Sequence, residues 1–152
     1  MNNFFTFQEG TLLILLFTSH LLADFIFATD KNVALRKEGM LKSQAFWLHG
    51  LCVLVVTWLI NRNSLSWSLL VVIVISHLII DYLKLLANRK ITVTQWKQKE
   101  LGLFVIDQAL HASVLIIVWV YMIDGFSRMQ MAVSHFANNY NILLKFLGYL
   151  IA

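Results

Sequence analysis

The sequence contains one cysteine, no proline and few charged residues. Because Cys52 is alone, an intrachain disulfide and a metal site built from several thiolates are both excluded. The lack of proline excludes proline kinks from every helix. Charged residues make up 13% of the chain, against about 25% in a typical soluble domain. This scarcity of charge disfavours a soluble protein.

Apolar residues make up 59% of the 152-residue chain, and they gather in four long runs. A helix that spans a bilayer needs about 20 mainly apolar residues. The sequence therefore predicts an all-α integral membrane protein with a single domain over residues 1–152 and a bundle of four transmembrane helices. The runs cover about residues 7–28, 45–60, 67–87 and 101–123.

Basic residues gather in two connections between the runs, and cytoplasmic loops are rich in Lys and Arg. We therefore expect a multi-pass protein of the inner (cytoplasmic) membrane, with cytoplasmic loops at 30–44 and 88–100 and the N-terminus outside. The net charge of +4 then favours the lipid bilayer as partner and disfavours nucleic acid. The basic residues are Lys31, Arg36, Lys37 and Lys42 in the first loop and Arg89, Lys90, Lys97 and Lys99 in the second.

The last part of the chain permits two interpretations. Apolar residues at helical spacing over about 128–151 favour a helix, but His135, Asn138 and Lys145 interrupt the apolar face. An amphipathic helix in the outer membrane interface is one interpretation. A fifth spanning helix is the other.

A short motif occurs twice, once in each half of the chain. Ser19-His20-Leu21-Leu22-Ala23-Asp24 returns as Ser76-His77-Leu78-Ile79-Ile80-Asp81, and Leu48-His49 is matched by Leu110-His111. Each half therefore has two helices, with repeat 1 at about 7–60 and repeat 2 at about 67–123. Two helix pairs with the same orientation predict an approximate two-fold axis along the membrane normal.

The repeated motifs place ionisable residues inside the apolar runs, where such residues are costly and usually functional. A spacing of four puts both members of each His/Asp pair on one helix face. At about 1.5 Å per residue, all seven groups fall in one layer in the cytoplasmic half of the bilayer. The seven residues are His20, Asp24, His49, His77, Asp81, Asp107 and His111.

Four imidazoles and three carboxylates are ligands that suit a divalent metal ion such as Zn, Fe or Mn. We therefore predict that the seven residues form a metal site. Asp107 has Ala45 as its counterpart in the first repeat, so Asp107 is our candidate for a catalytic base or for the ligand that breaks the symmetry. Lys84 follows Asp81 by one turn and is a candidate for substrate binding, with a snorkelling lysine or an Asp81 salt bridge as alternatives.

Three classes of function remain open at this point. A metal-dependent hydrolase at the cytoplasmic side would act on a lipid or phosphoester, a membrane-embedded or lipid-like substrate. A transporter or channel would bind a moving cation or proton with the same groups. A structural subunit, for example within a homo-oligomer, would use them as an interhelical polar network. Haem is disfavoured because three carboxylates beside the histidines would be unusual.

The motifs together resemble those of a family of small bacterial membrane proteins that is classified as a domain of unknown function. The resemblance covers about residues 12–118 and implies a polytopic membrane protein. The intramembrane His-x-x-x-Asp motifs are also similar to those of bacterial proteins named membrane-bound metal-dependent hydrolases. The matching segments are Ser19-His20-Leu21-Leu22-Ala23-Asp24-Phe25 with Asp30, His77-x-x-x-Asp81-x-x-Lys84, and Asp107-Gln108-x-x-His111.

Overall fold

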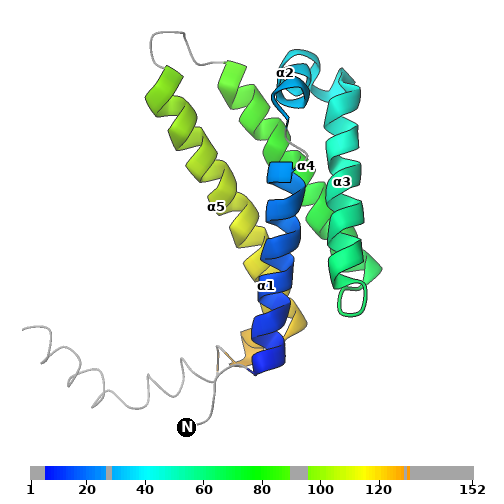
Figure 1. The fold of residues 1–152 in the computed structure, drawn as a ribbon. Coiled ribbons are helices and arrows are strands. Elements are labelled where there is room, and N and C mark those ends of the chain that lie inside the picture. Colours follow the sequence, from blue (N-terminus) through cyan, green and yellow to red (C-terminus); the bar gives the residue numbers. More distant parts are fainter. Residues whose placement is uncertain (1–5, 27–28, 90–95, 129, 131–152) are drawn as a thin grey trace, which may run out of the picture. The chain divides into compact units, whose positions relative to one another are not determined.

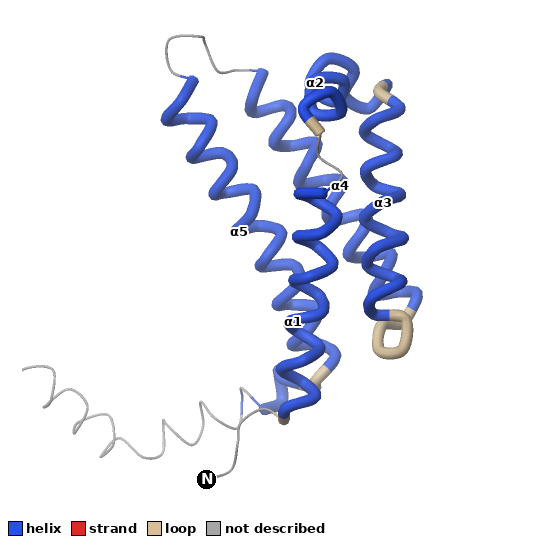
Figure 2. Tube along the Cα trace, in the orientation of Figure 1, coloured by secondary structure: helices blue, strands red, loops and turns tan. Residues whose placement is uncertain are grey.

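The computed structural model describes residues 6–26, 29–89, 96–128 and 130, and the elements in this part of the chain are all helical (Figures 1 and 2). The predicted all-α class is therefore confirmed. Residues 1–118 and 119–152 form two separate units. The site described below lies in the first unit. The predicted C-terminal helix at about 128–151 falls almost wholly outside the described residues.

The first helix, α1 (Phe7–Leu21), begins at a capping box and continues into a π-helical turn. The Thr6 backbone N–H donates to Glu9 Oε2 at 2.7 Å, and the Glu9 backbone N–H donates to Thr6 Oγ1 at 3.2 Å. These reciprocal bonds satisfy donors that every helix start leaves open. The π-helical turn η1 (Leu22–Ile26) carries Asp24. Such turns are rare and often occur at functional sites.

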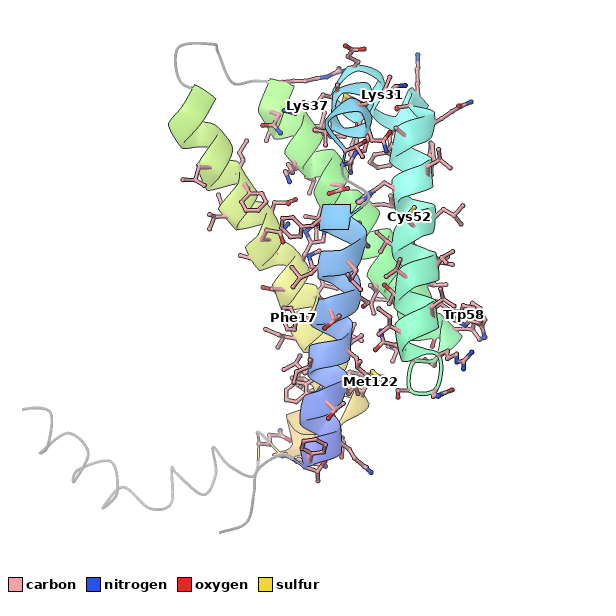
Figure 3. The ribbon with its side chains drawn as sticks, in the orientation of Figure 1. Phe17, Lys31, Lys37, Cys52, Trp58 and Met122 are labelled. Atoms are coloured by element: carbon pink, nitrogen blue, oxygen red, sulfur yellow. The ribbon has the colours of Figure 1, made fainter. Side chains whose placement is uncertain are left out.

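The first basic connection is a helix rather than an extended loop. Helix α2 (Asp30–Gly39) starts at Thr29, whose hydroxyl accepts the Asn32 backbone N–H at 3.4 Å. Its interior is rich in Ala, Leu, Arg, Lys and Glu, which favour helix. A short 3₁₀ turn η2 (Met40–Lys42) follows, and Lys31 and Lys37 lie on α2 (Figure 3). Helix α2 packs against α3 and brings basic side chains to the bundle.

Three further helices follow, α3 (Gln44–Asn61), α4 (Trp67–Arg89) and α5 (Trp96–Met122). Within the described residues, the segments Gln44–Asn61, Trp67–Arg89 and Leu101–Met122 are long and apolar enough to cross a membrane. They coincide with three of the apolar runs that the sequence predicts. Helix α1 alone has 15 residues, and η1 adds five.

The outer surface of the helices is unusually apolar for a soluble protein. Large apolar residues such as Ile14, Leu59, Ile79 and Ile117 are more than half exposed. The interior contains polar side chains beside an apolar core. This arrangement suits an apolar solvent around the helices, so the protein is associated with a membrane. The buried polar residues are Ser19, His20, His49, Thr57, Asn61, His77, Asp81, Asp107 and His111.

Helix α3 packs against both α1 and α4. At one point the approach to α4 is close, because a Cβ built on Gly50 would lie 2.8 Å from Leu78 Cδ2. Between α1 and α3, Asn61 Nδ2 donates to Ser19 Oγ at 3.4 Å, a polar contact of the kind that joins membrane helices. Gly50 immediately follows His49, so the close packing fixes the position of that imidazole.

We predict that Gly50→Val lowers the thermal stability of the detergent-purified protein. The added methyl groups meet the Leu78 side chain, and overpacking of this kind costs about 1–3 kcal/mol. Gly102→Val is the matched control, because a Cβ at Gly102 has nothing within 4 Å. Combining Gly50→Val with Leu78→Ala should recover most of the loss. An unchanged melting temperature for Gly50→Val would show that the close approach of α3 and α4 at this position does not contribute to stability.

Candidate metal site

The structure brings all seven predicted ligand residues together from four segments of the chain. Each of three overlapping groups offers ligand atoms within 4.8 Å of one another. His77 belongs to two of these groups and Asp24 to two, so the groups form one connected cluster. The groups are His20, Asp24 and His77; His49, His77 and Asp81; and Asp24, Asp107 and His111. These buried residues can hold a metal ion.

Two imidazoles form the centre of the cluster. His49 Nε2 on α3 lies 3.0 Å from His77 Nε2 on α4. A carboxylate oxygen lies close to each of these nitrogens. Asp81 Oδ2 lies 3.2 Å from His49 Nε2 and 3.7 Å from His77 Nε2. Asp24 Oδ1 lies 3.4 Å and 3.3 Å from the same two nitrogens. Each carboxylate therefore completes a triangle with the same pair of histidines.

The sides of these triangles match the spacing of ligands around a metal. For ligand distances of about 2.0–2.2 Å, neighbouring ligand atoms lie about 2.8–3.1 Å apart in octahedral geometry and about 3.3–3.6 Å apart in tetrahedral geometry. Four of the five distances run from 3.0 to 3.4 Å, and the fifth, between Asp81 Oδ2 and His77 Nε2, is slightly longer at 3.7 Å. Two histidines and one carboxylate are also the ligand set of many catalytic zinc and non-haem iron sites. The donor set therefore fits a divalent ion.

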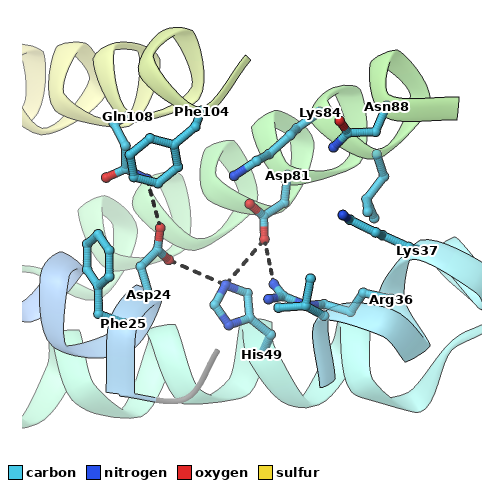
Figure 4. A pocket seen from close by; sticks show the side chains of 12 residues that line it. Asp24, Phe25, Arg36, Lys37, His49, Asp81, Lys84, Asn88, Phe104 and Gln108 are labelled. Carbon is cyan, nitrogen blue, oxygen red and sulfur yellow. Dashed lines mark hydrogen bonds and ion pairs between the residues drawn. The ribbon is translucent and has the colours of Figure 1, made fainter. Parts of the chain in front are cut away.

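Asp24 is oriented from a neighbouring helix. Its Oδ2 accepts a hydrogen bond from Gln108 Nε2 at 3.3 Å and lies 3.8 Å from His20 Nε2. Its Oδ1 faces the two central imidazoles (Figure 4 shows the contact with His49). A ligating carboxylate commonly has its second oxygen held in this way. Gln108 on α5 thus joins α5 to the turn η1.

His111 presents a free lone pair to the interior. Its Nδ1 lies 2.8 Å from the Asp107 backbone oxygen, which can only accept, so Nδ1 is the donor and a neutral ring carries its lone pair on Nε2. Nε2 is buried and has no hydrogen-bond partner among the described residues, and the same holds for His20 Nε2. The two rings stack at 4.8 Å between centroids, and the His111 ring lies 4.3 Å from that of His77. Buried, unsatisfied imidazole nitrogens at a donor cluster support a metal site.

Asp107 is fully buried and is held by Lys84. Lys84 Nζ donates to Asp107 Oδ2 at 2.6 Å, and Gln108 Nε2 donates to the same oxygen at 3.2 Å. The suggested salt bridge between Lys84 and Asp81 is therefore wrong, because Lys84 pairs with α5 instead. Asp107 Oδ1 has no hydrogen-bond partner among the described residues. Oδ2 of Asp107 is thus held in an ion pair, and Oδ1 can bind a metal ion or accept a proton.

Sequence reasoning missed Arg36. Its Nη1 donates to Asp81 Oδ2 at 3.3 Å, across 45 positions of sequence. The side chain comes from α2, which the sequence had suggested only as a basic loop. Arg89 Nη2 donates to the Glu38 backbone oxygen at 3.1 Å and holds the other end of α2. No signal in the sequence indicates either contact, since a basic residue in such a loop is normally solvated.

A cavity of about 240 Å³ lies between the cluster and α2. Figure 4 shows side chains from η1, α2, α3, α4 and α5 around it. Asp24, His49 and Asp81 form one part of its wall, and basic side chains form another. The remaining lining residues are mostly apolar and include Phe25 and Phe104. The candidate metal ligands are therefore accessible from a cavity.

Comparison with known proteins gives one family and no function. No curated protein and no solved structure matches the sequence. The family model described as "Protein of unknown function (DUF3307)" matches residues 12–140, a range that includes all seven candidate ligands. This match confirms the family resemblance drawn from the His-x-x-x-Asp motifs. The chain therefore belongs to the family Protein of unknown function (DUF3307).

Proposed function

We propose that the protein is a membrane metalloprotein whose ion is held by His49 and His77 with a carboxylate of Asp24 or Asp81. One observation carries this proposal. The two Nε2 atoms lie 3.0 Å apart in the interior, and the oxygens of Asp81 and Asp24 lie 3.2 Å and 3.3 Å from the nearer nitrogen. His20, Asp107 and His111 complete the site as further ligands or as groups that orient them.

We propose a four-helix membrane bundle in which α1 with η1 crosses the bilayer beside α3, α4 and α5. Together α1 and η1 run from Phe7 to Ile26, which is long enough to span. The two helix pairs would be related by an approximate two-fold axis, which pairs His20 with His77 and His49 with His111. The basic α2 and the 88–100 segment would lie on the cytoplasmic side of an inner membrane.

We propose hydrolysis as the reaction, with a lipid or phosphoester as substrate. A divalent ion supplies a Lewis acid that acidifies water and polarises the scissile bond. Asp107 would accept a proton at Oδ1, the oxygen not engaged by Lys84 or Gln108. Gln108 would hold Asp24 and Asp107 in place through its amide. The cavity between the cluster and α2 would admit the substrate.

Cation or proton transport is a second candidate, and one feature favours it. A cavity of about 10 Å³, roughly the room that one water requires, touches His20, His77 and Thr57. Fully buried Ser19 and Asn61 accompany Thr57 in α1 and α3. Polar side chains therefore continue from the cluster along the helices, as a path for a proton or ion would require.

We predict that the purified protein binds a stoichiometric amount of a divalent metal and that His77→Ala loses it. His77 contributes to both triangles, so its removal leaves neither complete. Metal content is measured by inductively coupled plasma mass spectrometry after loading with Zn²⁺, Mn²⁺ or Fe²⁺ and removal of excess ion. Ser113→Ala is the control, because its hydroxyl is exposed and donates to the Ala109 carbonyl on the same helix.

A well-folded wild-type preparation that retains no metal under any of these loadings would contradict the metal site. The cluster would then be an interhelical polar network. Circular dichroism of His77→Ala must show the helical content of the wild type, so that metal loss is not a consequence of unfolding. His77→Gln, which keeps a polar side chain in the interior, provides a second variant if His77→Ala does not fold.

We predict that metal-loaded protein hydrolyses p-nitrophenyl phosphate and that Asp107→Asn lowers kcat by about 10²–10⁴-fold, the usual contribution of a general base. Chelator-treated protein should be inactive. The metal content of Asp107→Asn distinguishes a base, which leaves metal in place, from a ligand, which does not. Metal-dependent cation or proton flux in proteoliposomes without hydrolysis would contradict the hydrolase and support transport.

A further inference from the structure

The cavity beside the cluster is lined by three cationic side chains, none of which is a candidate metal ligand. Arg36, Lys37 and Lys84 all line it. Figure 4 shows Arg36 and Lys37 reaching toward it from α2 and Lys84 from α4. The carboxylates Asp24 and Asp81 line the same cavity, and Asp81 pairs with Arg36. Three cations around one small cavity in an apolar bundle form a site for an anion.

Charge balance links this anion to the metal. Without an ion, the three cations are matched by Asp24, Asp81 and Asp107, since Arg36 pairs with Asp81 and Lys84 with Asp107. A divalent ion on neutral histidines adds two positive charges to the same region. In a medium of low dielectric constant, such an excess must be compensated. A dianion in the cavity would restore neutrality.

The cations have donors left for such a ligand. A guanidinium has five N–H donors and an ammonium three. The Arg36 contact with Asp81 uses Nη1, and the Lys84 contact with Asp107 uses one ammonium hydrogen. Both side chains can therefore bind a further oxygen without releasing their carboxylates. Metal binding to Asp81 would also free Arg36 from part of its attraction to that group.

The size and lining of the cavity limit what the anion can carry. About 240 Å³ is below the roughly 300–1,000 Å³ of pockets for drug-sized ligands. Phe25, Val33, Leu85 and Phe104 supply an apolar part of the wall. The space suits a tetrahedral phosphate with a few bonded carbon atoms, such as a small phosphate ester or a lipid headgroup with its glycerol.

We propose that this cavity binds the dianion of a phosphate monoester, with Arg36, Lys37 and Lys84 as its ligands, and that binding requires the metal-loaded site. This inference rests on the proposed metal function and deepens it by naming the substrate class. Coupling is reciprocal, so the phosphate monoester also tightens metal binding. A zwitterionic phosphodiester lacks the second negative charge and binds more weakly.

The test is isothermal titration calorimetry of detergent-purified full-length protein, with and without Zn²⁺. Glycerol 3-phosphate represents a soluble source of the monoester, and dihexanoyl phosphatidic acid represents a lipid source. Dihexanoyl phosphatidylcholine is the diester control. We expect metal-loaded protein to bind at least one monoester about tenfold more tightly than chelator-treated protein. Preference for one of the two monoesters identifies the source.

Variants of α2 test the ligands directly. Lys37→Gln and Arg36→Gln should weaken monoester binding by about tenfold, the typical loss of one charge-assisted hydrogen bond. Lys31→Gln is the matched control, because it makes the same charge change on the same helix but does not line the cavity. Circular dichroism and metal content are measured for every variant, so that weak binding reflects neither misfolding nor metal loss.

Three results would overturn the inference. If the affinity for the monoester is the same with and without metal, binding is not coupled to the metal. If Lys37→Gln and Arg36→Gln bind the monoester as tightly as the wild type, these residues are not its ligands. Failure of both monoesters to bind metal-loaded protein removes the site while the metal function stands. Elemental analysis shows independently whether metal is bound. If no metal binds, both the proposed metal function and this inference are contradicted.

Discussion

The arrangement of this bundle depends on pairing each buried ionisable side chain with groups that offset the cost of removing its charge from water. An isolated charge in an apolar interior costs several kcal/mol, so every buried carboxylate of the cluster requires partners. Asp24 meets two imidazoles and Gln108, Asp81 meets Arg36, and Asp107 meets Lys84. Each of these contacts joins different helices or turns. The polar cluster therefore fixes how α3, α4, α5 and η1 lie around it.

The same compensation explains why the cluster suits a metal. The contacts satisfy some polar atoms but leave the lone pair of His111 Nε2 without a donor among the described residues. The nitrogens His20 Nε2 and His49 Nδ1 are likewise buried without a hydrogen-bond partner in this part of the chain. A network selected only to join helices would more readily pair each nitrogen with a donor or an acceptor. A divalent cation satisfies several such lone pairs at once.

Much of the site could be predicted because helix periodicity is local. A spacing of four places His20 beside Asp24 and His77 beside Asp81, and the structure has both pairs within 3.8 Å. The position of α2 against the bundle could not be predicted from the sequence. The composition of α2 is that of an ordinary solvent-exposed connection, so nothing in it indicates the contact between Arg36 and Asp81. The π-helical turn at Asp24 likewise has no proline or glycine to indicate it.

X-ray absorption spectroscopy of the metal-loaded protein tests the central claim most directly, because it reports the ligands of the bound ion itself. The account predicts a shell of nitrogen and oxygen atoms at about 2.0–2.2 Å. It also predicts the multiple-scattering signal of at least two imidazoles, which should weaken in His49→Ala. A shell of oxygen atoms alone, without imidazole, would place the ion elsewhere and contradict the account.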